Sequence, residues 1–290
     1  HATAVSNWTV RDLTMDLSGM TTYPVEAVRC MRIVDCTRFS VRNVRFKTPG
    51  AATACMRCSD YEIAGNTVQV ASADGAAHHD GVIDQWDGCH DFTVRDNAID
   101  GGGIALYPIL VTGTDSSNVA TPCYNFSICN NRIRNTNEVG LWVQGRSGTC
   151  YNFDVTNNLV DGVTDYYGIA VTDSHSWRVT GNETRNTGLN GLRFGTEGSG
   201  TTAATDGVAQ GNVIVGANVL TSTNDGDGSA ISVNSTSARL SIVGNKVRGS
   251  AHRTPWSSAA SPRTRWPPEF KTVESRSGSP LTHAIAAEDH

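Results

Sequence analysis

One short phrase returns along this chain and places an asparagine at the same offset in seven of its copies. The clearest copy reads Cys89, Phe92, Val94, Asn97 and Ile99. The other asparagines of the series are Asn66, Asn131, Asn158, Asn182, Asn212 and Asn245. Successive copies begin 22 to 34 residues apart, counting two upstream copies that lack the asparagine. Spacing in this range is typical of solenoid proteins, in which one structural unit is stacked many times.

The apolar residues inside the phrase alternate, as Phe92 and Val94 do, and this period of two indicates a strand. A second short apolar run precedes most copies, at residues 140–143, 168–171, 191–194 and 228–231. Two or three short strands in each coil, stacked in parallel register, make a β-helix of about nine coils. Asparagine suits such a corner, because it tolerates left-handed backbone and its side-chain amide can bond the same amide one coil away.

The phrases end near residue 249, which predicts two parts: a parallel β-helix over 1–249 and a C-terminal tail over 250–290. The tail is rich in Pro, Arg and Ser, without alternation, and we expect it to be irregular, disordered or packed along the coils. A net charge of −5 and the lack of a basic stripe before the tail argue against nucleic acid as a partner. No apolar run approaches the roughly 20 residues of a membrane helix. Since it starts at His1 without a signal pattern, we interpret the chain as a processed product or an excised fragment.

Five of the eight cysteines occupy the same position of the phrase: Cys36, Cys58, Cys89, Cys123 and Cys150. Stacked coils lie about 4.8 Å apart, so these residues form a column, which we predict to consist of buried free thiols. Cys55 and Cys58 also form a CxxC pair, but no second pair follows. We therefore expect no metal ligands among them.

The pattern of Gly-apolar-x-apolar followed by aromatic-x-Val-x-x-Asn-x-Ile resembles the right-handed parallel β-helix proteins of the pectate-lyase-like superfamily, over residues 5–249. The resemblance implies an all-β, single-stranded, right-handed parallel β-helix. It also implies a polysaccharide partner, since members of the superfamily cleave, epimerise or bind polysaccharides. Straight columns of outward side chains make a long shallow groove that suits an extended sugar chain.

Residues 78–88 are the segment richest in chemically reactive side chains. The segment is similar to the Asn-Thr-Asp-Gly-Ile-Asp stretch of the polygalacturonase family at Asp80, Gly81 and, with one residue inserted, Asp84. The Asp-Asp pair of that family is missing, because the next coil reads Gly-Gly-Gly-Ile-Ala-Leu over 101–106, and its later Gly-His-Gly is absent too.

Asp80 and Asp84 are our leading catalytic candidates, with Asp87 or Glu138 as the partner carboxylate. One coil step of about 4.8 Å fits the carboxylate separation of a retaining glycosidase, and two steps fit that of an inverting one. If Val82 points inward, Asp84 does too. We favour the other register, in which Ile83 points inward and Asp84 faces solvent, because a buried unpaired carboxylate is costly. A polar turn with a solvated acidic face is the competing interpretation.

Aromatic, histidine and arginine side chains near these carboxylates are candidates for substrate binding, through stacking on sugars and pairing with carboxylates. They are His78, His79, Trp86, Trp142, Tyr166 and Arg193. Edge-packed aromatics and a solubilising arginine are the competing interpretation of the same residues.

Three functions follow as hypotheses. The first is a polysaccharide hydrolase that needs no cofactor. The second is a lyase or uronate epimerase, in which carboxylates hold calcium. The third is a noncatalytic glycan-binding spike or adhesin, as in viral tail proteins that resemble this fold and are often homotrimers. We expect the protein to be secreted, extracellular or on a virion surface.

Overall fold

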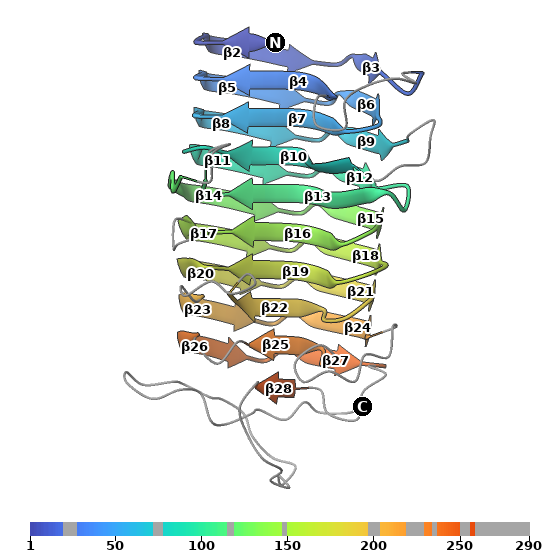
Figure 1. Ribbon diagram of the computed structural model, residues 1–290, viewed down its shortest axis with the longest axis vertical. Helices are drawn as coiled ribbons and strands as arrows, with labels where there is room; N and C mark the ends of the chain where they lie inside the picture. The colour runs from blue at the N-terminus through green and yellow to red at the C-terminus, as the bar shows by residue number, and fades with distance from the viewer. Residues whose placement is uncertain are drawn as a thin grey trace, which may run out of the picture.

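The computed structural model describes residues 1–19, 28–71, 78–114, 119–146, 150–196, 204–218, 229–233, 237–249 and 256–258, with the backbone only for 78–80 and 256–258. Its strands form three parallel sheets of 10, 9 and 9 strands, which we name sheets A, B and C, and the chain visits them in turn (Figure 1). No helix occurs among these residues. The predicted all-β fold, a right-handed parallel β-helix of about nine coils, is confirmed.

Each of nine coils contributes one strand to each sheet, and β28 adds a tenth strand to sheet A. Sheet A holds β1 (Ala2–Thr3), β4 (Arg29–Val34), β7 (Ala51–Met56), β10 (His78–Trp86), β13 (Ala105–Thr112), β16 (Val139–Gln144), β19 (Tyr167–Thr172), β22 (Leu192–Gly195), β25 (Ile231–Val233) and β28 (Trp256–Ser258). Sheet B holds β2 (Ser6–Arg11), β5 (Thr37–Arg42), β8 (Ser59–Ala64), β11 (His90–Arg95), β14 (Cys123–Cys129), β17 (Cys150–Thr156), β20 (Ser174–Thr180), β23 (Thr205–Gln210) and β26 (Ala238–Val243). Sheet C holds β3 (Thr14–Asp16), β6 (Arg45–Thr48), β9 (Thr67–Val70), β12 (Ala98–Asp100), β15 (Arg132–Thr136), β18 (Leu159–Val163), β21 (Glu183–Thr187), β24 (Val213–Ala217) and β27 (Lys246–Arg248).

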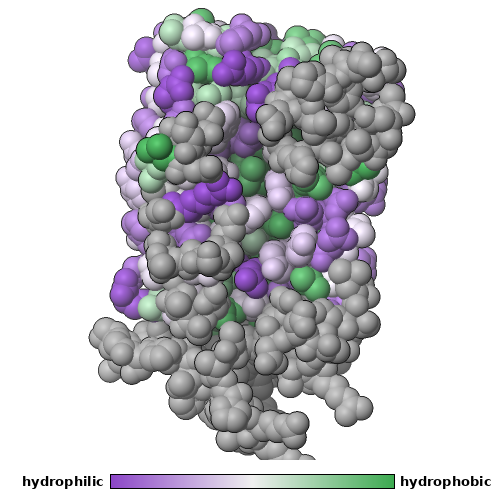
Figure 2. All heavy atoms as spheres, viewed as in Figure 1, coloured by the Kyte–Doolittle hydropathy of each residue, from purple (hydrophilic) through white to green (hydrophobic). Residues whose placement is uncertain are grey.

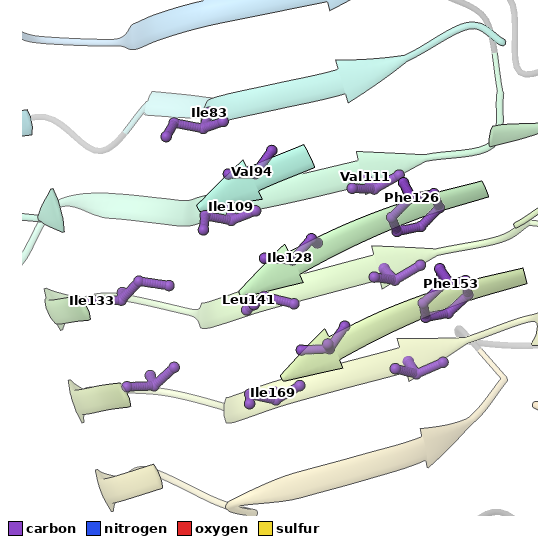
Figure 3. Packing of buried hydrophobic residues seen from close by; sticks show 14 of the residues in the cluster. Ile83, Val94, Ile109, Val111, Phe126, Ile128, Ile133, Leu141, Phe153 and Ile169 are labelled. Atoms are coloured by element: carbon purple, nitrogen blue, oxygen red, sulfur yellow. The ribbon is translucent and has the colours of Figure 1, made fainter. Parts of the chain in front are cut away.

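The core is a set of straight rows that run along the solenoid axis. In sheet A, Ile83, Ile109, Leu141 and Ile169 are successive partners across the strands, and each is at most 1% exposed. Figure 3 shows this row facing the inward side chains of sheet B, among them Phe126 and Phe153. Like residues stack on like because strands in parallel register repeat the same alternation in every coil.

An aromatic row runs through the first six coils on the inner side of sheet B: Trp8, Phe39, Tyr61, Phe92, Phe126 and Phe153. The next two positions are Trp177 and Gly207. A Cβ at Gly207 would lie 2.1 Å from the Trp177 ring, so the glycine leaves room for the larger indole. Trp177 stacks instead on Phe194 of sheet A, with the ring centroids 4.8 Å apart.

The asparagine ladder forms as predicted at the corner between sheets B and C. The side-chain Nδ2 of each ladder asparagine donates to Oδ1 of the next, at 2.9 Å from Asn97 to Asn131 and at 2.9 Å from Asn131 to Asn158. The amide also donates to a backbone carbonyl, as Asn131 does to Val94 at 3.0 Å. One detail of the prediction is wrong, because the left-handed residue is the one before the ladder asparagine, for example Asn130 at φ 57°. The ladder residue keeps ordinary backbone, which aims its amide along the axis.

The cysteine column also forms as predicted. All eight cysteines are free, and the five members of the column are 0% exposed. Burial raises the pKa of Cys55, Cys89 and Cys123 well above the usual value for a thiol. These residues therefore act as small apolar side chains of the core.

Only a short part of the predicted tail belongs to the described residues. Trp256–Ser258 form β28, which pairs with β25 and continues sheet A past residue 249. Within the described part of the chain, no helix is long and apolar enough to cross a membrane.

We predict that Asn131→Ala destabilises the protein by at least about 3 kcal/mol, because Asn97, Val94 and Asn158 each lose a buried hydrogen-bond partner. Urea denaturation measures this loss. Ser127→Ala, which removes an outward hydroxyl of sheet B, is the control and should cost less than about 0.5 kcal/mol. Equal, small losses in both variants would contradict a structural role of the ladder.

We predict that Gly207→Ala destabilises the protein by about 1–3 kcal/mol through overpacking against Trp177. Trp177→Phe shortens the ring that the new methyl group meets. In that background the alanine should cost much less, so a double-mutant cycle should give a favourable coupling energy. A coupling energy near zero would show that Gly207 is not required by the size of the Trp177 indole.

Candidate functional site

The outer face of sheet A carries most of the predicted site residues. Ile83 and Gln85 point inward at 1% and 0% exposure, which confirms the predicted register and puts Asp84 and Trp86 on the outer side. One outer row follows the solenoid axis through five successive strands, β10, β13, β16, β19 and β22 (Figure 1). Its members are Asp84, Leu110, Trp142, Ala170 and Arg193. The fold thus aligns residues that lie more than 100 positions apart in the chain.

Asp84 lies on the predicted face but is only 6% exposed, so the expectation that it faces solvent is wrong. Leu110 is its neighbour in the row, and a Cβ at Gly81 would lie 3.2 Å from a carboxylate oxygen of Asp84. The carboxylate is therefore turned back along its own strand toward Gly81. The missing side chain at Gly81 provides the space that it occupies.

Asp87 lies at the corner after β10, within an ion-pair chain. Nη1 of Arg57 is 2.5 Å from Oδ2 of Asp87, and Nε of Arg57 is 2.6 Å from Oδ1 of Asp35. The guanidinium thus links three consecutive coils. A carboxylate neutralised in this way suits a structural role better than a catalytic one, so we leave Asp87 out of the proposed catalytic pair. Trp86 beside it is half-buried, with the Arg29 guanidinium 6.0 Å from its ring centroid.

Glu138 lies just before β16, in a cluster with two aromatic residues. The Tyr107 hydroxyl donates to Oε2 of Glu138 at 2.7 Å. The Tyr107 ring meets Trp142 edge-on, with centroids 5.2 Å apart. Nε1 of Trp142 donates to the Thr172 hydroxyl at 3.1 Å, which fixes the plane of the indole. Tyr107 was not among the predicted site residues, because it lies beside Pro108 in an apolar run that shows no sign of a polar partner.

Tyr166 and Arg193 extend this cluster over the next two coils through Tyr167. Arg193 places its guanidinium 4.9 Å from the Tyr167 ring centroid. Tyr166 is 43% exposed, and its ring centroid is 5.7 Å from that of Tyr167. No carboxylate among the described residues forms an ion pair with Arg193. Stacking on Tyr167 positions the guanidinium.

The side chains of His78, His79 and Asp80 lie outside the described residues, and these three candidates stay predictions. Their backbone forms an irregularity of β10, since His78 pairs with Ala105 while Gly81 pairs with Tyr107. His79 and Asp80 therefore lie opposite the single residue Leu106. By continued register Glu138 is level with Leu106, so it lies two coils beyond His79 and Asp80, as the spacing predicts.

The exposed surface of this face is mixed in character. In Figure 2, viewed from the same side as Figure 1, hydrophobic residues are visible among hydrophilic ones along the middle of the face. Among the described residues, no group of three or more His, Cys, Asp or Glu side chains could hold a metal ion.

An alginate lyase from a Paenibacillus species aligns with this structure at a TM-score of 0.55 and 11% identity, over 85% of this chain and 94% of the lyase. The fold is that of a right-handed parallel β-helix protein. An endo-xylogalacturonan hydrolase from Aspergillus tubingensis aligns with this β-helix at a TM-score of 0.49 and 12% identity, over 76% of this chain and 60% of the hydrolase. A tailspike protein of the E. coli bacteriophage HK620 aligns at a TM-score of 0.49 and 12% identity, over 88% of this chain and 54% of the tailspike.

No protein-family model and no curated protein matches the sequence of this β-helix. At identities this low, the structural likeness bears on the fold alone.

The Arg57 bridge predicts a specific dependence of stability on pH. The hydrogen bond from Arg57 lowers the pKa of the Asp35 carboxyl below its ordinary value of 3.8. A lowered folded-state pKa gives stability that is present above the unfolded value and is lost as the pH falls through the folded value. We predict that Arg57→Gln reduces the loss of unfolding free energy between about pH 4 and pH 2.

Urea titrations at several pH values measure this effect, which should be small because Asp35 is partly exposed. Arg45→Gln is the control, since Arg45 is an exposed arginine of sheet C with no carboxylate partner in the described structure. If Arg57→Gln and Arg45→Gln both lost as much unfolding free energy between about pH 4 and pH 2 as the wild type, the bridge would have no such role.

Proposed function

We propose that this β-helix is a polysaccharide hydrolase whose substrate lies along the outer face of sheet A. The observation that carries the proposal is the cluster of Glu138, Tyr107 and Trp142, next to Arg193 on Tyr167. It combines a partly exposed carboxylate, aromatic surfaces and a guanidinium that pairs with no described carboxylate, all on one straight face. An extended glycan needs these three kinds of group for cleavage, stacking and anchoring.

Trp142 supplies the stacking surface. Its indole is held by Thr172 on one side and by the Tyr107 edge on the other, so it loses little freedom when a sugar binds. Ala170 separates Trp142 from Arg193 in the outer row. Two coil steps, about 10 Å, therefore lie between the indole and the guanidinium. This spacing lets one sugar stack on Trp142 while a neighbouring polar group or carboxylate meets Arg193.

Asp84 and Glu138 are the proposed catalytic pair. The Asp84 carboxylate turns back toward Gly81, the partner of Tyr107, and Glu138 reaches Tyr107 from the other side. Asp84 and Glu138 belong to coils two steps apart, about 10 Å along the axis. Inverting glycosidases hold their carboxyl groups about 6.5–9.5 Å apart so that a water molecule fits between the base and the sugar, and we propose that this pair works in the same way.

The two environments suit different roles. Asp84 is enclosed beside Leu110, and we propose it as the acid that protonates a leaving oxygen. Glu138 is partly exposed and is oriented by the Tyr107 hydroxyl, as a base that activates water must be. Asp80 is the alternative acid, because its backbone lies next to Gly81.

Two other functions are outcomes of the test. A calcium-dependent lyase or epimerase would use the carboxylates to hold the ion, and a glycan-binding spike would use only Trp142, Tyr166 and Arg193. Polysaccharide substrates of this kind of protein occur outside cells, so we propose a secreted, extracellular or virion-surface location. For the spike we also propose a homotrimer, which sedimentation equilibrium would test.

A panel of acidic and neutral polysaccharides, read for new reducing ends and for ultraviolet absorbance, tests the proposal. We expect reducing ends without absorbance. Glu138→Gln and Asp84→Asn should each lower kcat by at least about 100-fold, whereas Trp142→Ala should mainly raise KM. Asp154→Asn, on the outer side of sheet B, is the matched control and should keep wild-type turnover.

An absorbing product that disappears with a chelator would identify a lyase instead. Glycan binding without any turnover would identify a spike or adhesin. Turnover that survives both Glu138→Gln and Asp84→Asn would remove the proposed carboxylate pair.

A further inference from the structure

A hollow lies on another side of the molecule from the candidate site, over the outer face of sheet C. It has a volume of about 630 Å³ and is formed by β9, β12, β15 and β18, which run along one edge of the view in Figure 1. Ligand pockets in proteins typically measure 300–1,000 Å³, so the hollow has the size of a ligand site. We call it the sheet C groove.

The sequence of the outer row explains why the surface is hollow here. Thr67, Ala98, Arg132 and Leu159 are successive partners across the four strands. Their inward neighbours, such as Ile99 and Ile133, are 1% exposed, so the row itself faces outward. Ala98 leaves a gap between the longer side chains on either side of it. The floor of the groove therefore combines a methyl group with the hydroxyl of Thr67 and the amide of Gln69.

The carboxylates of the groove already have partners. Nη2 of Arg134 is 2.9 Å from Oδ2 of Asp100, and Asn135 donates to Oδ1 of Asp100 at 3.0 Å. Asn186 donates to Oδ1 of Asp161 at 2.9 Å. The acidic side of the groove is thus occupied within the fold.

Arg132 differs from these residues. It is exposed, and no carboxylate among the described residues pairs with it. The side chains of Thr67 and Gln69 also make no hydrogen bond to any other residue that the structure describes. The groove therefore offers a free guanidinium above a floor of free hydroxyl and amide groups, with Leu159 as its apolar side.

We propose that the sheet C groove is a second ligand site, separate from the face of sheet A, which binds an acidic sugar. Arg132 binds the sugar carboxylate through two parallel hydrogen bonds, which a planar guanidinium forms well. Thr67 and Gln69 bind sugar hydroxyls, and Ala98 and Leu159 contact the apolar side of the ring. Binding in this groove does not require catalysis on sheet A, so the two proposals can be tested independently.

Calorimetric titration tests the site in a Trp142→Ala, Arg193→Ala background, which removes binding on sheet A. The probes are galacturonate, a galacturonate oligosaccharide and neutral galactose. We expect both acidic probes to bind and galactose to bind at least tenfold more weakly. The two acidic probes distinguish a site for a single residue from one that takes a longer chain.

Arg132→Ala should weaken acidic-sugar binding by at least about tenfold, because it removes a charge-assisted pair of hydrogen bonds. Ala98→Leu should weaken binding as much by filling the gap, without changing the charge. Arg45→Ala is the matched control, since Arg45 precedes Thr67 in the same outer row but does not line the groove. Arg45→Ala should leave the affinity within twofold of the background.

Three results would overturn the proposal. The first is no measurable binding of either acidic probe. The second is binding that Arg132→Ala and Ala98→Leu leave unchanged. The third is an equal loss in Arg132→Ala and Arg45→Ala, which would show general electrostatic attraction instead of a site.

Discussion

The structure depends on the pairing of buried side-chain amides at the corner between sheets B and C. A primary amide in a core costs free energy unless its donors and acceptor are satisfied, and here each ladder asparagine is satisfied by the coils next to it. The requirement fixes where each coil turns. With that corner fixed, the strands on both sides keep their register, and the apolar rows of the core follow.

The same register makes the outer faces useful. Asp84, Trp142 and Arg193 are distant in sequence, yet they share one outer row of sheet A. Thr67, Ala98 and Arg132 share another row on sheet C. A solenoid therefore places groups at multiples of about 4.8 Å along its axis. Both proposed sites use this spacing, with aromatic groups on the face of sheet A and the Arg132 guanidinium on that of sheet C.

The sequence predicted the periodic features well and the local departures from them poorly. The phrase around Asn97 gave the strands, the ladder and the thiol column, because each follows from a repeat that every coil shares. The inward position of Ile83 followed from the cost of burying Asp84. The burial of Asp84 did not follow, since it depends on the space at Gly81 and on Leu110 in the next coil. The Arg57 bridge to Asp87 and the Tyr107 contact with Glu138 join coils through side chains outside the repeated phrase.

The ladder also has a direction. From Asn66 to Asn212, each side-chain amide donates to Oδ1 of the next ladder asparagine toward the C-terminus, as Asn97 does to Asn131. At the upstream end, the backbone nitrogen of Val44 donates to Oδ1 of Asn66 at 2.9 Å. Any residue except proline supplies such a nitrogen, so the coil that starts the series needs no asparagine. At the downstream end, the amide of Asn245 donates to the Ala209 carbonyl at 3.0 Å, and no ladder asparagine follows it among the described residues. Polarity of this kind makes the two ends of the stack chemically unequal even though their coils look alike.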